Sequence, residues 1–460
     1  MSATPPEPPQ RALRWQVFAS GNGWTTLGLL LVITSVAFEG MGVATAMPAL
    51  MADIGTLETY AWPFVAFTSA MVYANVVAGR WADRSGPAAP LVTGIAIFAA
   101  GLVVAALAPS LMVLLLGRMA QGFGAGCAMV SVFVVIAQAY PARLRAPMLG
   151  WTASAWVLPA LLGPPLSAYI ATTWSWHWVF AAIAPIALMA LAMMMRRLRQ
   201  AANAPRPASH SGATKRWTLL AALGAAGSVA VISWLGERPG LAILPLAVAA
   251  VAVLVPSLRY LVPRGTLRAG TGVATAVLAR GLLAGTYMSM LAFLPLMLTQ
   301  IYRWDLTAAG AALIPGSLGW AVASNWQGSR PHLQRERVLR WGFLLLGAGT
   351  LGVLLVTVGV LNPWLAIVAQ AVAGTGMGLG APSVLLLVMG HSDPGQVGFN
   401  TAAAQLLDGV GTALMIGIGG ALTAALSLRA GYLTLLSILV LVVTVGALVS
   451  HRAALPNSAS

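Results

Sequence analysis

Four charged residues fall inside long apolar stretches of this sequence, where charge is costly enough to indicate function. They are Glu39, Arg118, Arg280 and Asp408. Only 8% of the 460 residues are charged, so these four stand out against their surroundings. A carboxyl group buried beside an arginine is balanced between two effects, because burial favours its neutral form and the arginine favours its ionised form. Such a group can take up and release a proton, and proton exchange is the chemistry that we expect here.

Counting along the expected helices pairs the four charges by depth. Glu39 lies about nine residues from the outer end of its helix and Arg118 about eight from the outer end of another, so both are roughly 12–14 Å deep. Arg280 and Asp408 each lie about ten residues from an inner end and could pair likewise. We predict that Glu39 is the principal proton site and that Arg118 tunes it, with a static buried ion pair as the alternative. Asp408 could serve a second proton or a particular substrate, or be only a structural partner of Arg280.

The amino-acid composition indicates what kind of chain must position these four charges. The chain is 59% hydrophobic with a mean hydropathy of +0.86, whereas a soluble domain carries roughly 25% charged residues. The net charge of +15 comes from arginines in short segments between apolar runs, without a basic face, which argues against nucleic acid as a partner.

Several kinds of chemistry lack the residues that they need. The single cysteine, Cys127, allows no disulfide framework, and no cluster of His, Cys and acids could hold a metal. No phosphate-binding loop is present to use ATP. We therefore expect no enzyme activity and no cofactor, with the proton gradient as the energy source.

Fourteen apolar runs are long enough to cross a bilayer, which takes about 20 residues. They lie at about 26–48, 60–79, 88–108, 110–139, 147–170, 177–195, 217–235, 240–262, 271–300, 306–326, 338–360, 363–389, 398–425 and 430–450. Arginines gather in alternate connections, which by the positive-inside rule places both termini in the cytoplasm. No removable signal peptide is expected before the first run. We expect a multi-pass protein of a bacterial inner membrane, in contact with the lipid bilayer.

The runs divide into six, two and six, which predicts an all-α polytopic membrane protein with two six-helix halves and a central pair of extra helices. The predicted parts are a cytoplasmic tail at 1–24, a six-helix half at 25–196, a basic cytoplasmic linker at 197–216, a two-helix insertion at 217–264, a second six-helix half at 265–450 and a cytoplasmic tail at 451–460. Two repeated halves place a site between them near the bilayer midplane. One chain can enclose that whole path, so we expect a monomer.

The segment after the second run reads Gly-Arg-Trp-Ala-Asp-Arg-Ser-Gly, from Gly79 to Gly86. It resembles the loop signature of the major facilitator superfamily, Gly-x-Leu-Ala-Asp-Arg-x-Gly. The glycines allow a tight turn between helices, and Asp83 can accept hydrogen bonds at a helix N-terminus. We expect Gly79, Asp83, Arg84 and Gly86 to latch the two halves in one state, with a plain turn-and-anchor role as the alternative. Pro87 stands where the family has a basic residue, which weakens the expected latch.

Other segments resemble the fourteen-helix drug:proton antiporters of that superfamily, with a major-facilitator-like fold. Arg118 and Gln121 match an Arg-x-x-Gln-Gly element whose arginine is linked to proton coupling. Gly163 and Pro164 are a partial match to the antiporter Gly-Pro motif. Glu39 stands in a segment similar to Leu-Asp-x-Thr-Ile-Val-Asn-Val-Ala-Leu-Pro, in place of the aspartate. The resemblance runs from about residue 31 to 415, nearly the whole apolar part of the chain.

This resemblance implies a proton-coupled antiporter that exports lipophilic small molecules, drugs or related metabolites, by alternating access. Such a protein confers multidrug efflux and antibiotic resistance. Its cavity is expected between the first, fourth, ninth and twelfth runs, with few polar groups, which suits varied lipophilic molecules. The candidate cavity residues are Thr34, Thr45, Gln121, Tyr287, Met290 and Phe293. The family usually has a small residue at the position of Asp408, so this acid is a departure.

Three other functions stay open. A dedicated exporter of one metabolite, siderophore or lipid would protect cells against a single compound rather than many. A proton-coupled uptake symporter is disfavoured by the antiporter-like segments around Gly163 and Glu39. A membrane scaffold or receptor without transport predicts that neutralising Glu39 changes nothing beyond folding.

Overall fold

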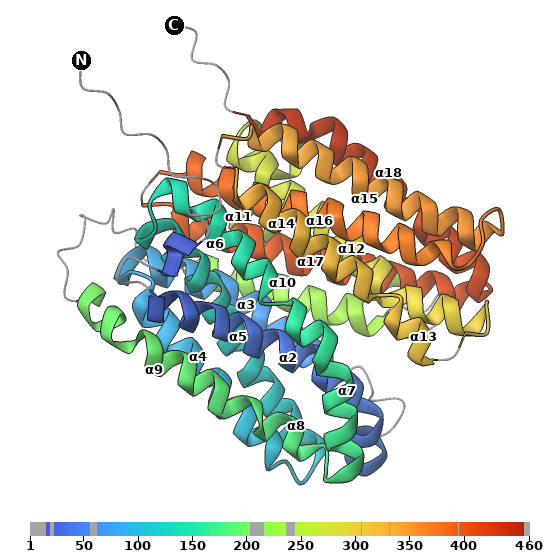
Figure 1. Ribbon diagram of the computed structural model, residues 1–460, viewed down its shortest axis with the longest axis horizontal. Helices are drawn as coiled ribbons and strands as arrows, with labels where there is room; N and C mark the ends of the chain where they lie inside the picture. Colours follow the sequence, from blue (N-terminus) through green and yellow to red (C-terminus); the bar gives the residue numbers. More distant parts are fainter. Residues whose placement is uncertain are drawn as a thin grey trace, which may run out of the picture.

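The computed structural model describes residues 15–18, 23–55, 62–202, 216–235, 244–304, 306–330, 332–393 and 395–454, and all regular structure within them is helical (Figure 1). Most of the predicted N-terminal tail, linker residues 203–215 and the tail after 454 lie outside the described residues. The helices form two groups with a separate pair between them in sequence.

The first group holds α2 (Gly23–Ile54), α3 (Trp62–Ser85), α4 (Ala88–Ala106), α5 (Leu111–Ala139), α6 (Ala142–Ser154), α7 (Val157–Thr173), α8 (His177–Ala181) and α9 (Ile183–Ala202). The pair is α10 (Arg216–Leu235) and α11 (Leu244–Leu261). The second group holds α12 (Val273–Gln300), α13 (Leu306–Ala311), α14 (Ile314–Gly328), α15 (Arg335–Val358), α16 (Leu365–His391), α17 (Val397–Ala425) and α18 (Leu428–Val449). Short 3-10 turns at Thr266–Arg268 and Ser450–Ala453 flank the second group.

Eleven helices in the described part of the chain are long and apolar enough to cross a membrane. They match eleven of the fourteen predicted runs. The runs predicted at 217–235 and 240–262 contain shorter apolar helices, Trp217–Ile232 and Pro245–Leu261. The run at 306–326 is divided between α13 and α14, which have 6 and 15 residues. The count of fourteen spans therefore stays a prediction, and a multi-pass membrane protein is what the helices define.

The outer surface of the bundle is apolar as well as its interior. Large side chains such as Leu116, Leu162 and Leu441 are exposed on α5, α7 and α18. Helices whose outer face is this apolar are stable in lipid, where hydrocarbon replaces water and every backbone polar group is satisfied within the helix. Inside, the buried apolar residues form two main cores, one mostly from the first group and one mostly from the second, and each includes a few residues of the other group.

Glycines set the same close contacts in both groups. Side chains added at Gly122, Gly124 and Gly126 of α5 would lie within 3.0 Å of α3 or α4. Side chains added at Gly374, Gly376 and Gly378 of α16 would lie equally close to α14 or α15. Residues without a side chain let helix backbones approach closely where lipid provides no hydrophobic drive for association. Helix α16 thus occupies in the second group the place that α5 has in the first.

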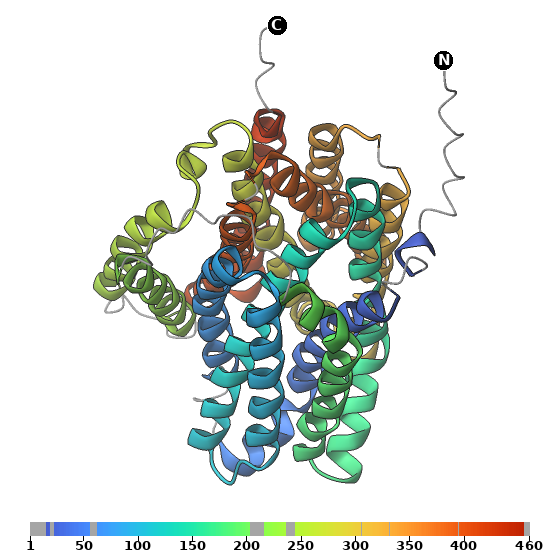
Figure 2. The same ribbon diagram turned by 90° about the vertical axis from the view of Figure 1, so that its left-hand side faces the viewer.

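The helix pair α10–α11 lies at the outside of the bundle (Figure 2). It packs through α10 against α3 and α17, one helix from each group. Gly224 of α10 approaches Ser257 and Val253 of α11, which holds the pair together. The pair covers the seam between α3 and α17 without entering the space between the two groups.

Candidate proton and substrate site

Glu39 and Arg118 form an ion pair inside the first group of helices. Arg118 Nη1 donates to Glu39 Oε1, and the side chains of Arg118 and Glu39 are 2% and 0% exposed. Helix α2 supplies the acid and α5 supplies the arginine. The other carboxylate oxygen, Glu39 Oε2, accepts no hydrogen bond from any described residue. One oxygen of this buried carboxylate is thus occupied and the other is available for a proton.

Arg118 has further partners that do not depend on Glu39. Its Nε donates to the Pro63 carbonyl at 3.2 Å, and its Nη1 also donates to Gln121 Oε1. Its guanidinium carbon lies 4.6 Å from the centre of the Phe67 ring, a cation–π distance. Gln121 is itself fixed by a 3.0 Å hydrogen bond to the Gly101 carbonyl. The arginine is therefore held in place even when Glu39 is neutral.

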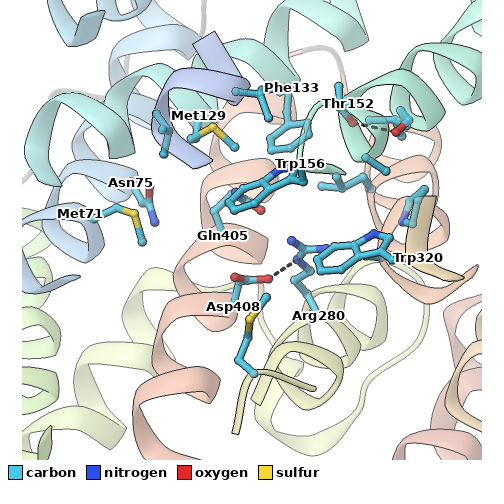
Figure 3. Close-up of a pocket in the computed structure, with 18 residues that line it drawn as sticks. Met71, Asn75, Met129, Phe133, Thr152, Trp156, Arg280, Trp320, Gln405 and Asp408 are labelled. Carbon is cyan, nitrogen blue, oxygen red and sulfur yellow. Dashed lines mark hydrogen bonds and ion pairs between the residues drawn. The ribbon is translucent and has the colours of Figure 1, made fainter. Parts of the chain in front are cut away.

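Arg280 of α12 and Asp408 of α17 form a second ion pair, in the second group of helices. Arg280 Nε lies 2.6 Å from Asp408 Oδ1. The two side chains are 11% and 26% exposed, so this pair is more accessible than the pair of Glu39 and Arg118. Figure 3 shows Asp408 on one side of Arg280 and Trp320 on the other. Among the described residues, Asp408 is the ionic partner of Arg280.

The accessible pair lines a cavity of about 150 Å³ between the two groups. Its lining is mainly apolar and aromatic, with two amides and the two charges among the polar groups (Figure 3). The lining residues are Ile33, Val36, Met71, Asn75, Met129, Phe133, Leu149, Thr152, Ala153, Trp156, Arg280, Met288, Trp320, Ala381, Pro382, Leu385, Gln405 and Asp408. Both charges come from the second group, and the first group contributes mainly apolar and aromatic residues, with Asn75 and Thr152 as its polar ones.

The candidate cavity residues that the structure describes do not line this cavity. Tyr287 and Met290 are buried within the second group, and Phe293 packs beside Tyr432 there. Thr34 donates to the Ala155 carbonyl at 3.2 Å. Gln121 instead accepts a hydrogen bond from Arg118, as described above. The Thr45 side chain lies outside the described residues.

The predicted residues do not line the cavity because of the rotation of each helix about its axis. The helices named in the prediction, α2, α5, α12 and α16, do line the cavity, but with different faces. Sequence reasoning missed Asn75, Trp156, Trp320 and Gln405. Gln405 lies one helical turn before Asp408, and that spacing was a signal that could have found it. The two tryptophans carried no such signal, since the sequence holds 16 of them.

Asp83 joins the two groups of helices at one end of the bundle. It lies in the last turn of α3, and its Oδ1 and Oδ2 accept hydrogen bonds from the backbone N–H groups of Gly398 and Phe399 at 2.8 and 2.7 Å. These donors are at the start of α17, where the helix dipole favours a negative charge. Arg80 adds a contact with the Phe399 ring, its guanidinium carbon 5.0 Å from the centroid.

The remaining residues of this motif contribute in different ways. Gly86 has φ of +77° and makes the turn from α3 to α4. Gly79 makes no turn, contrary to the prediction for the motif's glycines, because it lies inside α3. A side chain at Gly79 would collide with Ala402 and the Gly398 carbonyl, so this glycine permits close approach to α17. Arg84 is exposed at the end of α3.

A second contact between the groups lies between α6 and α14. A side chain at Gly328 of α14 would lie within 3.0 Å of the Ala146 carbonyl of α6. Asn325 Nδ2 of α14 donates to Ser154 Oγ of α6. Together with the Asp83 contact, this packing joins the two groups at that end.

The Gly-Pro segment lies on α7, next to the helix that carries Glu39. A side chain at Gly163 would be 3.4 Å from Met41 Cβ and 3.7 Å from the Phe38 ring. Gly163 therefore faces the stretch of α2 that contains Glu39. The Pro164 side chain lies outside the described residues.

An apolar polytopic bundle, with a mainly apolar cavity that carries one pair of opposite charges between two similar helix groups, is the architecture of a two-bundle membrane transporter. The chain belongs to the major facilitator superfamily, because the family model described as Major Facilitator Superfamily matches residues 29–407. The crystal structure of the human organic anion transporter MFSD10 (TETRAN) has the same fold, with a TM-score of 0.66 at 15% identity over 96% of this chain and 100% of that one.

Curated relatives include named drug exporters. Multidrug resistance protein 3 of Bacillus subtilis is 26% identical over 313 residues, covering 65% of this chain and 60% of that protein. Multidrug efflux pump SdrM of Staphylococcus aureus is 28% identical over 171 residues, covering 37% of this chain and 38% of that protein. The chain thus matches about 60% or less of the length of these two relatives.

Proposed function

We propose that this protein is a proton-coupled antiporter that exports lipophilic small molecules, with Glu39 as its main proton site. The observation that carries the proposal is the buried pair of Glu39 and Arg118, in which one carboxylate oxygen stays unengaged by the described residues. Two relatives named for multidrug resistance or efflux support export of drugs or related metabolites. On this proposal the chain is of the fourteen-helix drug:proton antiporter type.

The partners of Arg118 make Glu39 the group that can change its charge. A neutral Glu39 leaves the arginine bound to the Pro63 carbonyl, to Gln121 and to the Phe67 ring. Removing one member of a buried ion pair is costly mainly when the remaining charge loses its partners. Arg118 keeps three partners when Glu39 is protonated, whereas Asp408 is the ionic partner of Arg280 among the described residues. Protonation therefore costs less at Glu39 than at Asp408.

Alternating access would work between the two helix groups. We divide the chain as predicted, with six-helix halves at 25–196 and 265–450 and the insertion at 217–264. Contacts at Asp83 and Asn325 close one end of the central space in this structure. In the other state these contacts would break, and the cavity would open at that end. Gly79, Asp83, Arg84 and Gly86 would form the latch, and Gly163 and Pro164 would shape α7 beside Glu39.

The membrane placement follows from the arginines. The end of the bundle that holds the two closing contacts also carries Arg84, Arg143, Arg330 and Arg337, which lie in or next to the terminal turns of their helices. The positive-inside rule makes this end cytoplasmic. We therefore propose a bacterial inner-membrane protein with cytoplasmic termini, closed toward the cytoplasm in this structure. One chain holds both halves, and we propose that it works as a monomer without a cofactor.

The test is proton release from detergent-purified protein on addition of a panel of lipophilic drugs, comparing wild type with Glu39→Gln. The matched control is Asp393→Asn, which removes an exposed acid in the connection before α17. We expect drug-dependent release from wild type and the control, and none from Glu39→Gln at unchanged thermal stability. Equal release from all three would refute Glu39 as the proton site. Release with a single compound only would favour a dedicated exporter.

A further inference from the structure

The central cavity presents a pair of opposite charges rather than one charge. Asp408 and Arg280 both line it, and the cavity's other polar groups are uncharged. Asp408 is 26% exposed, against 0% for Glu39, so the two carboxylates face different surroundings. A group that lines the cavity meets substrate, whereas one sealed inside a helix group does not.

The pair of Arg280 and Asp408 is poorly suited to binding a ligand that carries a single charge. Arg118 has several partners besides its acid, but the ionic partner of Arg280 among the described residues is Asp408. A cation that captured Asp408 would leave the arginine unpaired at low dielectric, and an anion that captured Arg280 would leave the carboxylate unpaired. Either outcome is strongly unfavourable for a buried charge. A ligand that carries both charges satisfies both groups at once.

We propose that the cavity binds aromatic zwitterions whose ammonium and carboxylate groups lie close together, as in an aromatic amino acid. The ammonium would bind Asp408 and the carboxylate would bind the guanidinium of Arg280, whose planar fork suits a carboxylate. Arg280 Nε and Asp408 Oδ1 lie 2.6 Å apart, so the two groups match charges separated by one or two carbons better than charges at opposite ends of a long molecule. This inference rests on the proposed function of an exporter and narrows its substrates from lipophilic molecules in general to those that join an apolar aromatic part to a zwitterionic head.

The rest of the cavity fixes the orientation and the size of the ligand. Phe133 and Trp156 come from the first group and Trp320 from the second, so an aromatic ring meets aromatic walls. The wall opposite the charges contains Ile33 and Met129, which would receive the apolar end. The volume of about 150 Å³ is below the roughly 300–1,000 Å³ of pockets for drug-sized ligands. A compact molecule fits with less widening than a large one.

The experiment uses four forms of one scaffold, naphthylalanine: the free amino acid, its methyl ester, its N-acetyl derivative and the N-acetyl methyl ester. They are zwitterion, cation, anion and neutral molecule with the same ring. Equilibrium dialysis measures binding to wild type and to the double variant Arg280→Gln/Asp408→Asn, which replaces both charged groups by neutral amides. We expect wild type to bind the zwitterion at least about tenfold more tightly than either singly charged form. The double variant should lose that preference while still binding the neutral form.

Wild type that binds the cation or the anion as tightly as the zwitterion, or binds none of the four, would overturn the proposal. So would a double variant that keeps the preference, and a thermal melt separates loss of binding from loss of fold. Uptake into proteoliposomes with an imposed pH gradient tests the proposed function separately. Preference for the zwitterion in binding without gradient-driven transport would support the substrate class and refute proton-coupled export.

Discussion

The contact of Asp83 with the start of α17 predicts how strongly one conformation is favoured. In Asp83→Asn the side chain keeps one acceptor oxygen, loses its charge, and directs an amide N–H₂ toward one of the two backbone donors, Gly398 or Phe399. The closed arrangement loses these interactions and the open one does not, because they join the two helix groups. The substitution therefore shifts the equilibrium toward opening at this end.

The size of the shift follows from the two hydrogen bonds. Bonds to a charged group contribute about 1.5–3 kcal/mol each. We take about 2 kcal/mol for the change, since one bond is kept and Asp83 is only partly buried. Every 1.4 kcal/mol is about a tenfold change in equilibrium constant, so the ratio of open to closed rises about 30-fold. An open state populated at about 1% would rise to roughly a quarter of the molecules.

Pulsed electron spin resonance between two labels measures these populations. Cysteines replacing Ala142 at the start of α6 and Gln334 just before α15 are suitable, because both residues are exposed and lie in different helix groups. The natural Cys127 is buried and would be replaced by alanine in all samples. We expect a second, longer distance to appear in Asp83→Asn.

The matched control is again Asp393→Asn, which removes the same charge close to α17 without removing these hydrogen bonds. It should change the distance distribution by less than about twofold. If Asp83→Asn and Asp393→Asn give the same distribution as wild type, the Asp83 contact does not set the conformational equilibrium and the reasoning is wrong.

Three further predictions concern packing and charge. Gly374→Ala should lower stability by about 1–3 kcal/mol because its new methyl group meets α14. Gly390→Ala on the same helix has open space around it and should be nearly neutral. Thermal unfolding in detergent compares the two variants. Arg118→Gln should destabilise the protein by about 3–5 kcal/mol because it leaves Glu39 unpaired. Adding Glu39→Gln should recover part of this loss in the same assay. No recovery would show that the two residues are not coupled. Trp156→Ala should weaken binding of aromatic ligands by about 0.5–1.5 kcal/mol or more in equilibrium dialysis, and unchanged affinity would remove this residue from the site.

The sequence was most informative about helices and charge pairs. Apolar runs located all the long helices of the described residues, because a helix in lipid must be apolar along a fixed length. Counting residues from helix ends matched Glu39 with Arg118 and Arg280 with Asp408, since depth is a linear function of position in a straight helix. The same counting had no means of telling which pair lies in the cavity.

The lining of the cavity could not be read from the sequence because it depends on the rotation of each helix. In a soluble helix a polar face and an apolar face reveal that rotation. Here nearly all faces are apolar, so Thr34 and Tyr287 were as plausible as Ile33 and Met288, and packing against neighbouring helices decided between them. The aromatic residues Trp156 and Trp320 gain their role only from helices distant in sequence.

The donors that bind Asp83 are main-chain N–H groups, which every residue except proline provides. The α17 side of this contact is therefore encoded by the position of a helix end and not by a side chain. Homologous chains can diverge there without losing the donors, as long as no bulky group at position 398 displaces the carboxylate. The chemical constraint on this contact therefore falls on Asp83 of α3. A comparison of related sequences should show a constrained acid that faces a segment of α17 whose own constraint is on size and not on chemistry.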